Sequence, residues 1–579
     1  MDEFERLAGG FQPASEQDWQ SLAAKGDKDR LSRLRSRSMD GIPVGPLYVP
    51  HRGPILAMRP AAAPWRVLRR VVAEDGATGR TSQIPLEEDP CGVQFLFIPI
   101  SAADCRTPDS EARAAAALSE IASTLSGADL PLWIDAGSAT PRFVRLAASH
   151  GRVNAVYDPL AALAAATGAT DPTADFAAIG EMIRSGREGL SVTADGRPWH
   201  NGGATEVQEL GIVLASAVAA LRFLGDETIH PETAWQRLGI WLAADADQFL
   251  TIAKFRAARL LLARLAEVAG LDGSPPIQGE TSWRMLGARE PTMNLVRATT
   301  AAFAAAVGGA DAIAVLPPML EDEDLSARMA RNVQLILLEE AALARSADPG
   351  AGSGAVEDLT ARLAADAWAL FTRIEAEGGL PAAIRSGSIV GAVAHARDAR
   401  LEAVARRRLP MVGVNVNVDP DAPLPVLDPA DTRTDVPADA GRLRPVRLAE
   451  PFERLAVRLA EAMGGEPAVV FRAGKGGDPD LADALAALGI RARFLASVDA
   501  LETPPRLACI IVGEGGEAQA AETAARLRAA GARVLVAALA GSEITPGWCD
   551  AIITPDADLN AIMAGLLDRI ADRQEKGQG

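Results

Sequence analysis

Residues 508–539 read ACIIVGEGGEAQAAETAARLRAAGARVLVAAL. The stretch has an apolar run at 508–512, an Ala- and Arg-rich segment of helical period at 518–531, and a second apolar run at 533–539. Short, continuous apolar runs on either side of an amphipathic helix are typical of parallel strands that are buried on both faces of a sheet. The stretch therefore predicts a β-α-β unit, and with it an α/β fold.

The same alternation continues over the C-terminal 130 or so residues. Further strands are expected at 467–471, 491–495 and 551–554, with helices at 451–463, 480–489 and 558–573. Five short strands with helical crossovers predict a flavodoxin-like domain, which binds ligands at the carboxyl ends of its strands. Two glycine clusters, GKGG (474–477) and GEGG (513–516), follow strands. Neither fits G-x-G-x-x-G, so we interpret both as tight turns.

A longer α/β region precedes this domain. Strand-like runs at 93–100, 131–136 and 311–318 alternate with helical segments at 205–224 and 255–270. Over this length, a (β/α)8 barrel with insertions is the economical solution, and an open doubly wound sheet is the alternative. We expect four parts: an N-terminal arm for subunit interaction (1–60), the barrel (61–414), a Pro- and Asp-rich linker (415–450) and the flavodoxin-like domain (451–579).

The arm is rich in proline and contains the basic segment KGDKDRLSRLRSRS (25–38). Such a segment cannot build its own core and gains stability by docking on something else. We therefore expect it to wrap a partner subunit. A solvated helix followed by irregular chain is the alternative.

Charge and cysteine content limit the function classes. The formal net charge is −18 and the pI is about 4.9, which argues against binding to nucleic acid or to an anionic membrane. The four cysteines form no C-x-x-C pair, the N-terminus lacks the apolar core of a signal peptide, and the longest apolar stretch (210–221) is too short to span a bilayer. We expect a cytoplasmic protein.

Histidine placement gives one candidate functional residue. No two of the five histidines have metal-ligand spacing, so no metal site is expected. His200 lies in RPWHNGGATEVQELG (197–211), between a strand-like stretch and a long helix, where barrel enzymes carry catalytic side chains. Capping of the helix is the alternative. Glu206 and Glu209, three residues apart on that helix, are expected to favour its dipole and to make partner contacts; an acid–base pair is the alternative.

Several blocks, in one order, resemble the methylmalonyl-CoA mutases, and specifically their small, non-catalytic subunits. They include MDGIPVGPLY (39–48), the block at 200–224, TSWRMLGAREPTMNLVRATTAAFAAAVGGADAIAVLP (281–317) and RMARNVQLILLEE (328–340). The resemblance implies a heterodimer with a large subunit that interconverts (R)-methylmalonyl-CoA and succinyl-CoA using adenosylcobalamin. In that family the acyl-CoA threads the barrel, and the C-terminal domain binds cobalamin.

The cobalamin-binding motifs of the family are altered in this chain. The loop that carries Asp-x-His-x-x-Gly in the family reads RAGKGGDPDLAD (472–483) here, with Lys475 and Asp478 among its residues, and no histidine follows His395. The family's Ser-x-Leu corresponds to Gly513 and Gly515, and its Gly-Gly to Ala537 and Ala538. The resemblance therefore implies a degenerate domain: adenosylcobalamin is bound by the large subunit, and no cofactor or metal is held by this chain.

The barrel also departs from the catalytic pattern. The family's active-site Tyr-His pair corresponds to Trp199-His200, and a substrate-contacting Tyr aligns with Arg70. Only Tyr48 and Tyr157 are present, too few to line a radical cavity. We therefore expect no catalytic residue, with His200 as a relic of the family's active-site histidine.

Two alternatives remain open. One is a stand-alone cobalamin-dependent acyl-CoA mutase, which needs another lower ligand for cobalt. The other is an acyl-CoA-binding regulatory or chaperone-like protein. The second requires an open barrel pore, so bulky side chains on the barrel axis would argue against it.

Overall fold

The computed structural model describes residues 15–49, 63–70, 95–99, 131–147, 152–166, 171–319, 323–424, 443–476, 480–539 and 547–571, and a few positions between 112 and 118. The chain is an α/β structure with two parallel sheets, as the sequence predicts. Asp478, the ends of the expected arm (1–14 and 50–60) and the middle of the expected linker (425–442) lie outside the described residues.

The larger sheet has eight parallel strands in the order β6-β5-β4-β3-β10-β9-β8-β7. The strands are β3 (Arg66–Arg70), β4 (Phe95–Pro99), β5 (Leu132–Asp135), β6 (Val153–Ala155), β7 (Val192–Asp195), β8 (Leu238–Ala244), β9 (Ile277–Thr281) and β10 (Ala312–Ala314). The two ends of this order are also joined. The amide of Ala155 donates to the carbonyl of Leu190 at 2.9 Å, and that of Thr193 donates to the carbonyl of Tyr157 at 3.1 Å.

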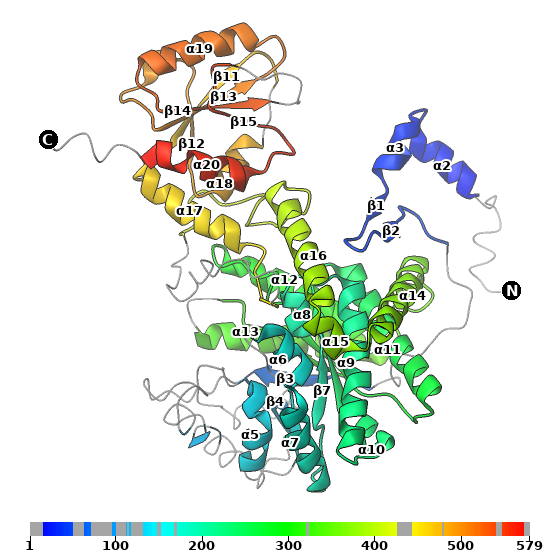
Figure 1. Ribbon diagram of the computed structural model, residues 1–579. Helices are drawn as coiled ribbons and strands as arrows, with labels where there is room; N and C mark the ends of the chain where they lie inside the picture. The colour runs from blue at the N-terminus through cyan, green and yellow to red at the C-terminus, as the bar shows by residue number, and fades with distance from the viewer. Residues whose placement is uncertain are drawn as a thin grey trace.

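Helices surround this sheet (Figure 1). They are α5 (Thr140–Leu146), α6 (Pro159–Ala165), α7 (Thr173–Arg184), α8 (Arg197–Asn201), α9 (Glu206–Asp226), α10 (Pro231–Gln236), α11 (Gln248–Ala269), α12 (Pro291–Val307), α13 (Glu323–Leu335), α14 (Gly354–Ala376), α15 (Leu380–Arg385) and α16 (Ser388–Ala405). The helices predicted at 205–224 and 255–270 are confirmed as α9 and α11. Helix α11 starts earlier than predicted, because Asp247 caps it by accepting from the amide of Leu250.

Helix α9 is the core helix of this unit. Among the described helices it alone is long and apolar enough to cross a membrane, but most of it is buried within the protein. Helix α14 packs across both α9 and α11 as an outer layer, and this packing accounts for the apolar character of α9.

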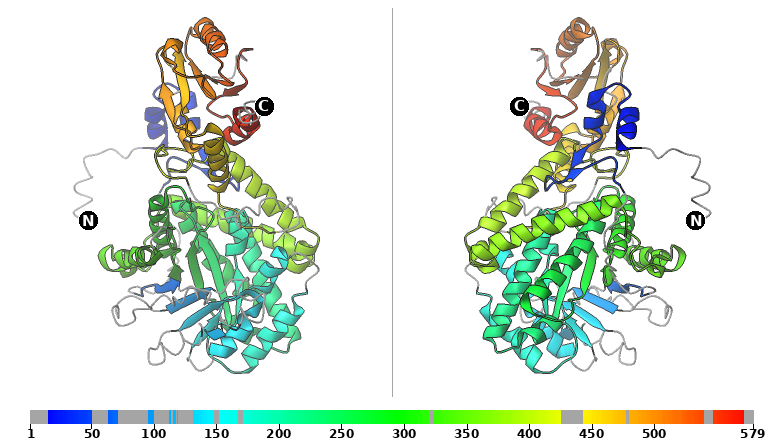
Figure 2. Two further views of the ribbon diagram at one scale, coloured as in Figure 1. Left: turned by 90° about the vertical axis from the view of Figure 1, so that its left-hand side faces the viewer. Right: turned by 90° about the vertical axis from the view of Figure 1, so that its right-hand side faces the viewer.

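The smaller sheet has five parallel strands in the order β12-β11-β13-β14-β15. They are β11 (Ala468–Ala473), β12 (Ala492–Phe494), β13 (Leu507–Val512), β14 (Val534–Leu539) and β15 (Ala551–Ile553), with helices α17 (Glu450–Met463), α18 (Leu481–Ala487), α19 (Glu517–Ala529) and α20 (Leu559–Ala571). Each element lies within a few residues of its predicted position. The sheet carries a hydrophobic core on each face, and the unit stands above the larger one in both side views (Figure 2).

The chain between the two units packs on both of them. Val414 and Val418 belong to the hydrophobic core of the smaller sheet. Residues 443–448 instead cross the larger unit, where the amide of Leu443 donates to the carbonyl of Ala164 and that of Val446 to the carbonyl of Asn201, at 3.0 and 2.9 Å. The described part of the expected linker is therefore docked structure that covers the face at which β7, β8 and β9 end.

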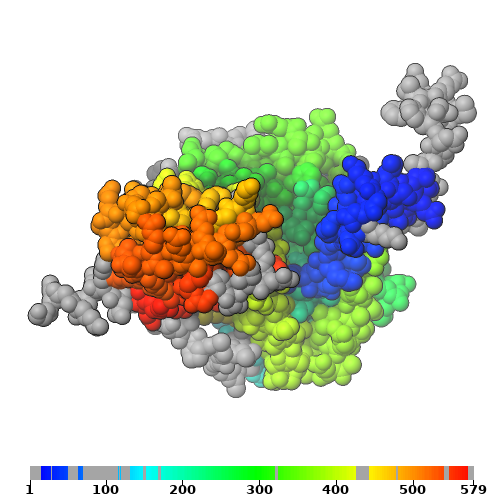
Figure 3. Space-filling view, turned by 90° about the horizontal axis from the view of Figure 1, so that it is seen from above, coloured from blue at the N-terminus to red at the C-terminus, as the bar shows by residue number. Residues whose placement is uncertain are grey.

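The described part of the arm contains α2 (Glu16–Ala24), α3 (Lys28–Arg33) and a short hairpin of β1 (Ser36–Arg37) and β2 (Pro43–Val44). The hairpin is anchored by Ile42, which is buried in the main core, whereas α2 has no buried residue. Viewed from above, this arm and the smaller unit lie on opposite sides of the same face of the larger unit (Figure 3).

Candidate functional site

His200 lies at the carboxyl ends of β7, β8 and β9, inside a buried polar cluster. Helix α8, which carries it, follows β7 directly. The Nδ1 atom is 3.1 Å from Oε2 of Glu209, and Nε2 is 2.9 Å from Oγ of Ser282 and 3.3 Å from Oδ2 of Asp245. We call His200, Glu209, Asp245, Lys254, Ser282 and Arg284 the His200 cluster. Both ring nitrogens are engaged and the side chain has no exposed surface, so this imidazole is held by the protein itself.

Glu209 joins three elements at the base of the cluster. Its Oε2 is 2.6 Å from Nζ of Lys254 on α11, and its Oε1 accepts from the amide of Ala243 on β8 at 2.8 Å. Burial alone would raise the pKa of Glu209, but Lys254 and His200 overcome this effect and lower the pKa to about 2. Because Glu209 and Lys254 are wholly buried, the expectation that Glu209 contacts a partner subunit is wrong.

Arg284 connects Asp245 with the segment that carries His200. Its guanidinium donates to Oδ2 of Asp245 from Nε (3.0 Å) and Nη2 (2.8 Å), and to the carbonyls of His200 (3.1 Å) and Ala204 (2.8 Å). Burial would raise the pKa of Asp245, but Arg284 and His200 hold it well below its usual range. Paired carboxylates, cations and carbonyls thus lock the loops that follow three strands.

A second group, the Arg197 cluster, lies inside the eight-stranded sheet. The Arg197 guanidinium is 2.7 Å from Asp195 on β7, 3.1 Å from Asp135 on β5 and 3.3 Å from Glu280 on β9, and its Cζ lies 4.2 Å from the ring centroid of Trp241. Burial raises the pKa of Asp135, an effect that Arg197 opposes. One cation therefore links strands β5, β7 and β9 across the interior.

Aromatic side chains fill the interior of the sheet next to the Arg197 cluster. Alternate residues of each strand face the interior, and Trp133 and Trp241 meet there edge to face, with ring centroids 5.7 Å apart. Leu68, Val156, Ala312 and Ala314 complete this apolar group. Trp133 is 3% exposed and Trp241 is 0% exposed, so the interior formed by the described residues is a packed core.

At the smaller sheet, the two glycine loops close against each other. They follow β11 and β13, the adjacent strands at which the strand order reverses and where such sheets bind ligands. The amide of Glu514 donates to the carbonyl of Lys475 at 2.9 Å, and the amide of Lys475 donates back to Glu514 at 3.2 Å. A Cβ on Gly513 would lie 2.3 Å from the carbonyl oxygen of Lys475. This contact explains why position 513 requires a glycine.

The other cofactor-related positions lie in these loops or in the sheet. Gly515 has φ +69° in the second loop. Ala537 and Ala538 are fully buried within β14, paired with Ile510 and Ile511 of β13. Among the described residues, no group of three His, Cys, Asp or Glu side chains could hold a metal ion.

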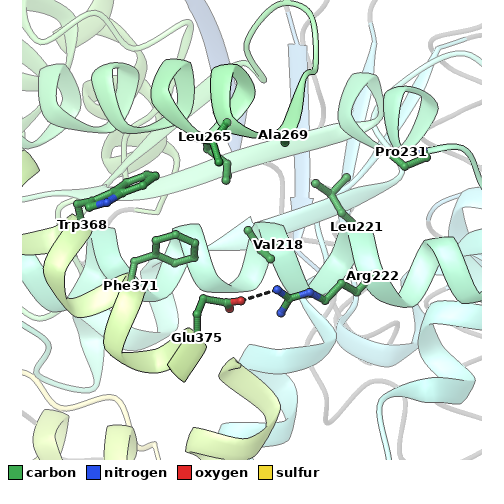
Figure 4. Close-up of a pocket in the computed structure, with 10 residues that line it drawn as sticks. Val218, Leu221, Arg222, Pro231, Leu265, Ala269, Trp368, Phe371 and Glu375 are labelled. Carbon is green, nitrogen blue, oxygen red and sulfur yellow. Dashed lines mark ion pairs between the residues drawn. The ribbon is translucent and has the colours of Figure 1, made fainter. Parts of the chain in front are cut away.

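A surface cavity of about 450 Å³ lies away from these clusters, between α9, α11 and α14 (Figure 4). Trp368 and Phe371 of α14 face Val218 and Leu265 across it, and Arg222 pairs with Glu375 at 2.6 Å beside it. Its lining is almost wholly apolar, and it has no contact with the His200 or Arg197 clusters.

Comparison with known proteins assigns the family. Residues 178–464 match the family model of methylmalonyl-CoA mutase. A protein of Streptomyces virginiae named methylmalonyl-CoA mutase small subunit is 35% identical over 512 residues, which cover 81% of this chain and 80% of that protein. The chain belongs to the methylmalonyl-CoA mutase family. The small subunit of Propionibacterium freudenreichii subsp. shermanii is 30% identical, over 71% of this chain and 69% of its own length.

Other relatives of this mutase family match over shorter spans. A protein of Mycobacterium bovis named probable methylmalonyl-CoA mutase small subunit is 41% identical over 44% of this chain and 42% of its own length. A Rhizobium meliloti protein named methylmalonyl-CoA mutase is 32% identical over 49% of this chain and 40% of its own length. The family match includes His200 and both polar clusters apart from Asp135.

Sequence reasoning located His200 but missed most of its partners. Ser282 and Arg284 lie in the block at 281–317 that carries the family resemblance, yet nothing local marks them as neighbours of His200. Lys254 had a usable signal, since it is a cation directly flanked by the apolar residues Ala253 and Phe255 of α11. Such a residue, when buried, requires a buried carboxylate, and Glu209 is that carboxylate.

Proposed function

We propose that this chain is the small subunit of a heterodimeric methylmalonyl-CoA mutase and is not itself catalytic. It would support a large subunit that isomerises (R)-methylmalonyl-CoA to succinyl-CoA with adenosylcobalamin. The names and coverage of the relatives support this assignment. In this proposal the chain contributes to an isomerase as a subunit and is inactive alone.

We also propose the finer architecture. The larger unit is a (β/α)8 barrel, supported by the strand order and by the hydrogen bonds that join the ends of that order. The smaller unit, with strand order 2-1-3-4-5, is a flavodoxin-like domain. The domain division at 1–60, 61–414, 415–450 and 451–579 is part of the same proposal.

The observation that carries the non-catalytic assignment is the filled interior of the larger sheet. An acyl-CoA that threaded a barrel would need the space taken by Trp133, Trp241 and the Arg197 cluster. Residues 443–448 cover the carboxyl ends of β7, β8 and β9, and His200 has no exposed surface. The same packing counts against an acyl-CoA-binding regulatory protein.

The residues of the smaller unit do not fit adenosylcobalamin. No histidine occurs after His395, so this domain has no imidazole to coordinate cobalt. The paired loops at Lys475 and Glu514 take the space at the strand ends where a nucleotide tail would enter. In the proposal, the large subunit binds the cofactor, which supplies the radical chemistry of the isomerisation.

The partner and the location belong to the proposal too. Helices α2 and α3 are exposed, and the segment 25–38 that contains α3 is basic in an otherwise acidic chain, so this part of the arm is suited to contact the large subunit. The sparse cysteines, without C-x-x-C pairs, support a cytoplasmic location.

Cobalamin retention tests this proposal. The full chain is mixed with adenosylcobalamin, alone and together with its large subunit, and passed through gel filtration. We expect cobalamin to elute only with the pair, at about one per heterodimer. Co-elution with the chain alone would overturn the proposal and favour a stand-alone mutase.

A further inference from the structure

The hairpin of the arm is seated on the larger unit through a carboxylate. Asp40 lies in its turn, where Oδ2 accepts from the amide of Val207 in the first turn of α9 at 3.4 Å. Ile42, two residues on, is 3% exposed in the main core. The hairpin has only four residues in its two strands and is too small to be stable alone, so its order depends on this seat.

Charged groups from two helices, α9 and α16, act on Asp40. Glu206 of α9 repels it, and Arg400 of α16 attracts it. Asp247, the N-cap of α11, and Asp245 after β8 lie close enough to influence Glu206 and Arg400 respectively. Arg284 adds positive charge beside Glu206 and repels Arg400.

Arg400 makes no direct hydrogen bond to Asp40 or Glu206 among the described residues. It is 7% exposed, and its Nε and Nη2 atoms have no hydrogen-bond partner among the described residues. It therefore attracts the surrounding carboxylates through space, without the bidentate pairing that usually fixes a buried arginine. Asp40 and Glu206 are thus two neighbouring acids. The nearby arginines compensate the charge of Glu206 but not that of Asp40.

We propose that the hairpin at residues 36–44 is a pH-sensitive strap, which binds the larger unit more tightly when Asp40 takes up a proton. Helices α2 and α3 lie N-terminal to this hairpin, so the strap also sets how firmly those exposed helices are held. The proposal does not depend on the identity of the partner or on the mutase assignment.

The direction of the pH dependence follows from the environment of Asp40. Burial, and then the charge of Glu206, raise its pKa from 3.8 to about 6, while Thr205, Val207 and Arg400 oppose the shift. A group whose pKa is raised in the docked state binds its proton more tightly there than in the free hairpin. The hairpin therefore docks more tightly as the pH falls through 6. Its docking equilibrium constant is about tenfold larger at pH 5 than at pH 7.5.

Hydrogen exchange of the full chain between pH 5 and pH 7.5 tests the strap. After correction for intrinsic rates, we expect protection of peptides spanning 36–44 to fall about tenfold across this range. Asp40→Asn, which mimics the protonated acid, should remove the dependence and keep protection high at pH 7.5. Asp29→Asn, on the exposed surface of the same arm, is the matched control and should behave as the unaltered chain.

Two outcomes would overturn the proposal. One is protection of 36–44 that does not change with pH in the unaltered chain. The other is an Asp40→Asn chain that keeps the full pH dependence. As a second variant, Arg400→Met should move the midpoint to higher pH, since Arg400 lowers the pKa of Asp40; a midpoint that moves downward would also contradict the proposal.

Discussion

Replacing Arg197 with Met should lower the free energy of unfolding by about 3–5 kcal/mol, because it removes the cation that three carboxylates share. Asp195 and Glu280 are themselves buried, and Met cannot replace the stacking of the guanidinium on Trp241. Urea unfolding of the full chain, followed by circular dichroism at neutral pH, measures this difference.

Arg184→Met is the matched control for Arg197. Arg184 is a half-exposed arginine that pairs with Glu227 at 3.7 Å, so its loss should cost less than about 1 kcal/mol. Equal costs for the two variants would show that the Arg197 cluster does not hold the strands together. The double variant Arg197→Met/Asp195→Asn should recover part of the loss, since it also removes the charge of one carboxylate that pairs with Arg197.

The second large effect is expected for Lys254→Met, which should lower the free energy of unfolding by about 3–5 kcal/mol. Lys254 and Glu209 are both wholly buried, and Met would leave the carboxylate to His200 and one backbone amide. Since the pKa of Glu209 is lowered from 4.5 to about 2, the ionised carboxylate stabilises the fold above pH 4.5. That contribution is lost as the pH falls toward 2. Unfolding curves at pH 7 and pH 3 measure both effects.

Lys475→Met provides the control for Lys254. Lys475 is exposed in the first glycine loop, and its described loop contacts are made by backbone atoms. We expect a change within about 0.5 kcal/mol. A Lys254 variant as mild as this control would mean that the buried ion pair adds nothing to stability.

The strands of the smaller unit were easier to predict from the sequence than several strands of the larger unit. In the smaller unit, strands such as β13 (LACIIV) are apolar on both faces and read as continuous runs. In the larger unit, β9 (IQGET) was not predicted, and β7 (VTAD) was visible only as a strand-like stretch before His200. Both point an acidic side chain inward, Glu280 and Asp195, to meet Arg197. An apolar pattern marks such strands poorly, because their interior partner is a charge.

The candidate site shows a similar limit. The position of His200 after a strand was visible locally. The contacts of His200 and Glu209 could not be predicted, because Ser282 lies 82 residues from His200 and Lys254 lies 45 residues from Glu209. Contacts of this range are set by strand order, which the sequence alone left between a barrel and an open sheet.

The turnover of the assembled complex tests the central claim most directly. The large subunit is combined with this chain carrying His200→Gln, and kcat for (R)-methylmalonyl-CoA is measured per mole of heterodimer isolated by gel filtration. The corresponding histidine of the large subunit is changed in a parallel control, which should lose activity. We expect kcat within about twofold of the unaltered complex, because His200 is fully buried and side chains of this chain engage both of its ring nitrogens. A loss of about 100-fold or more in an intact heterodimer, the scale of a missing general acid, would show that this chain takes part in the chemistry.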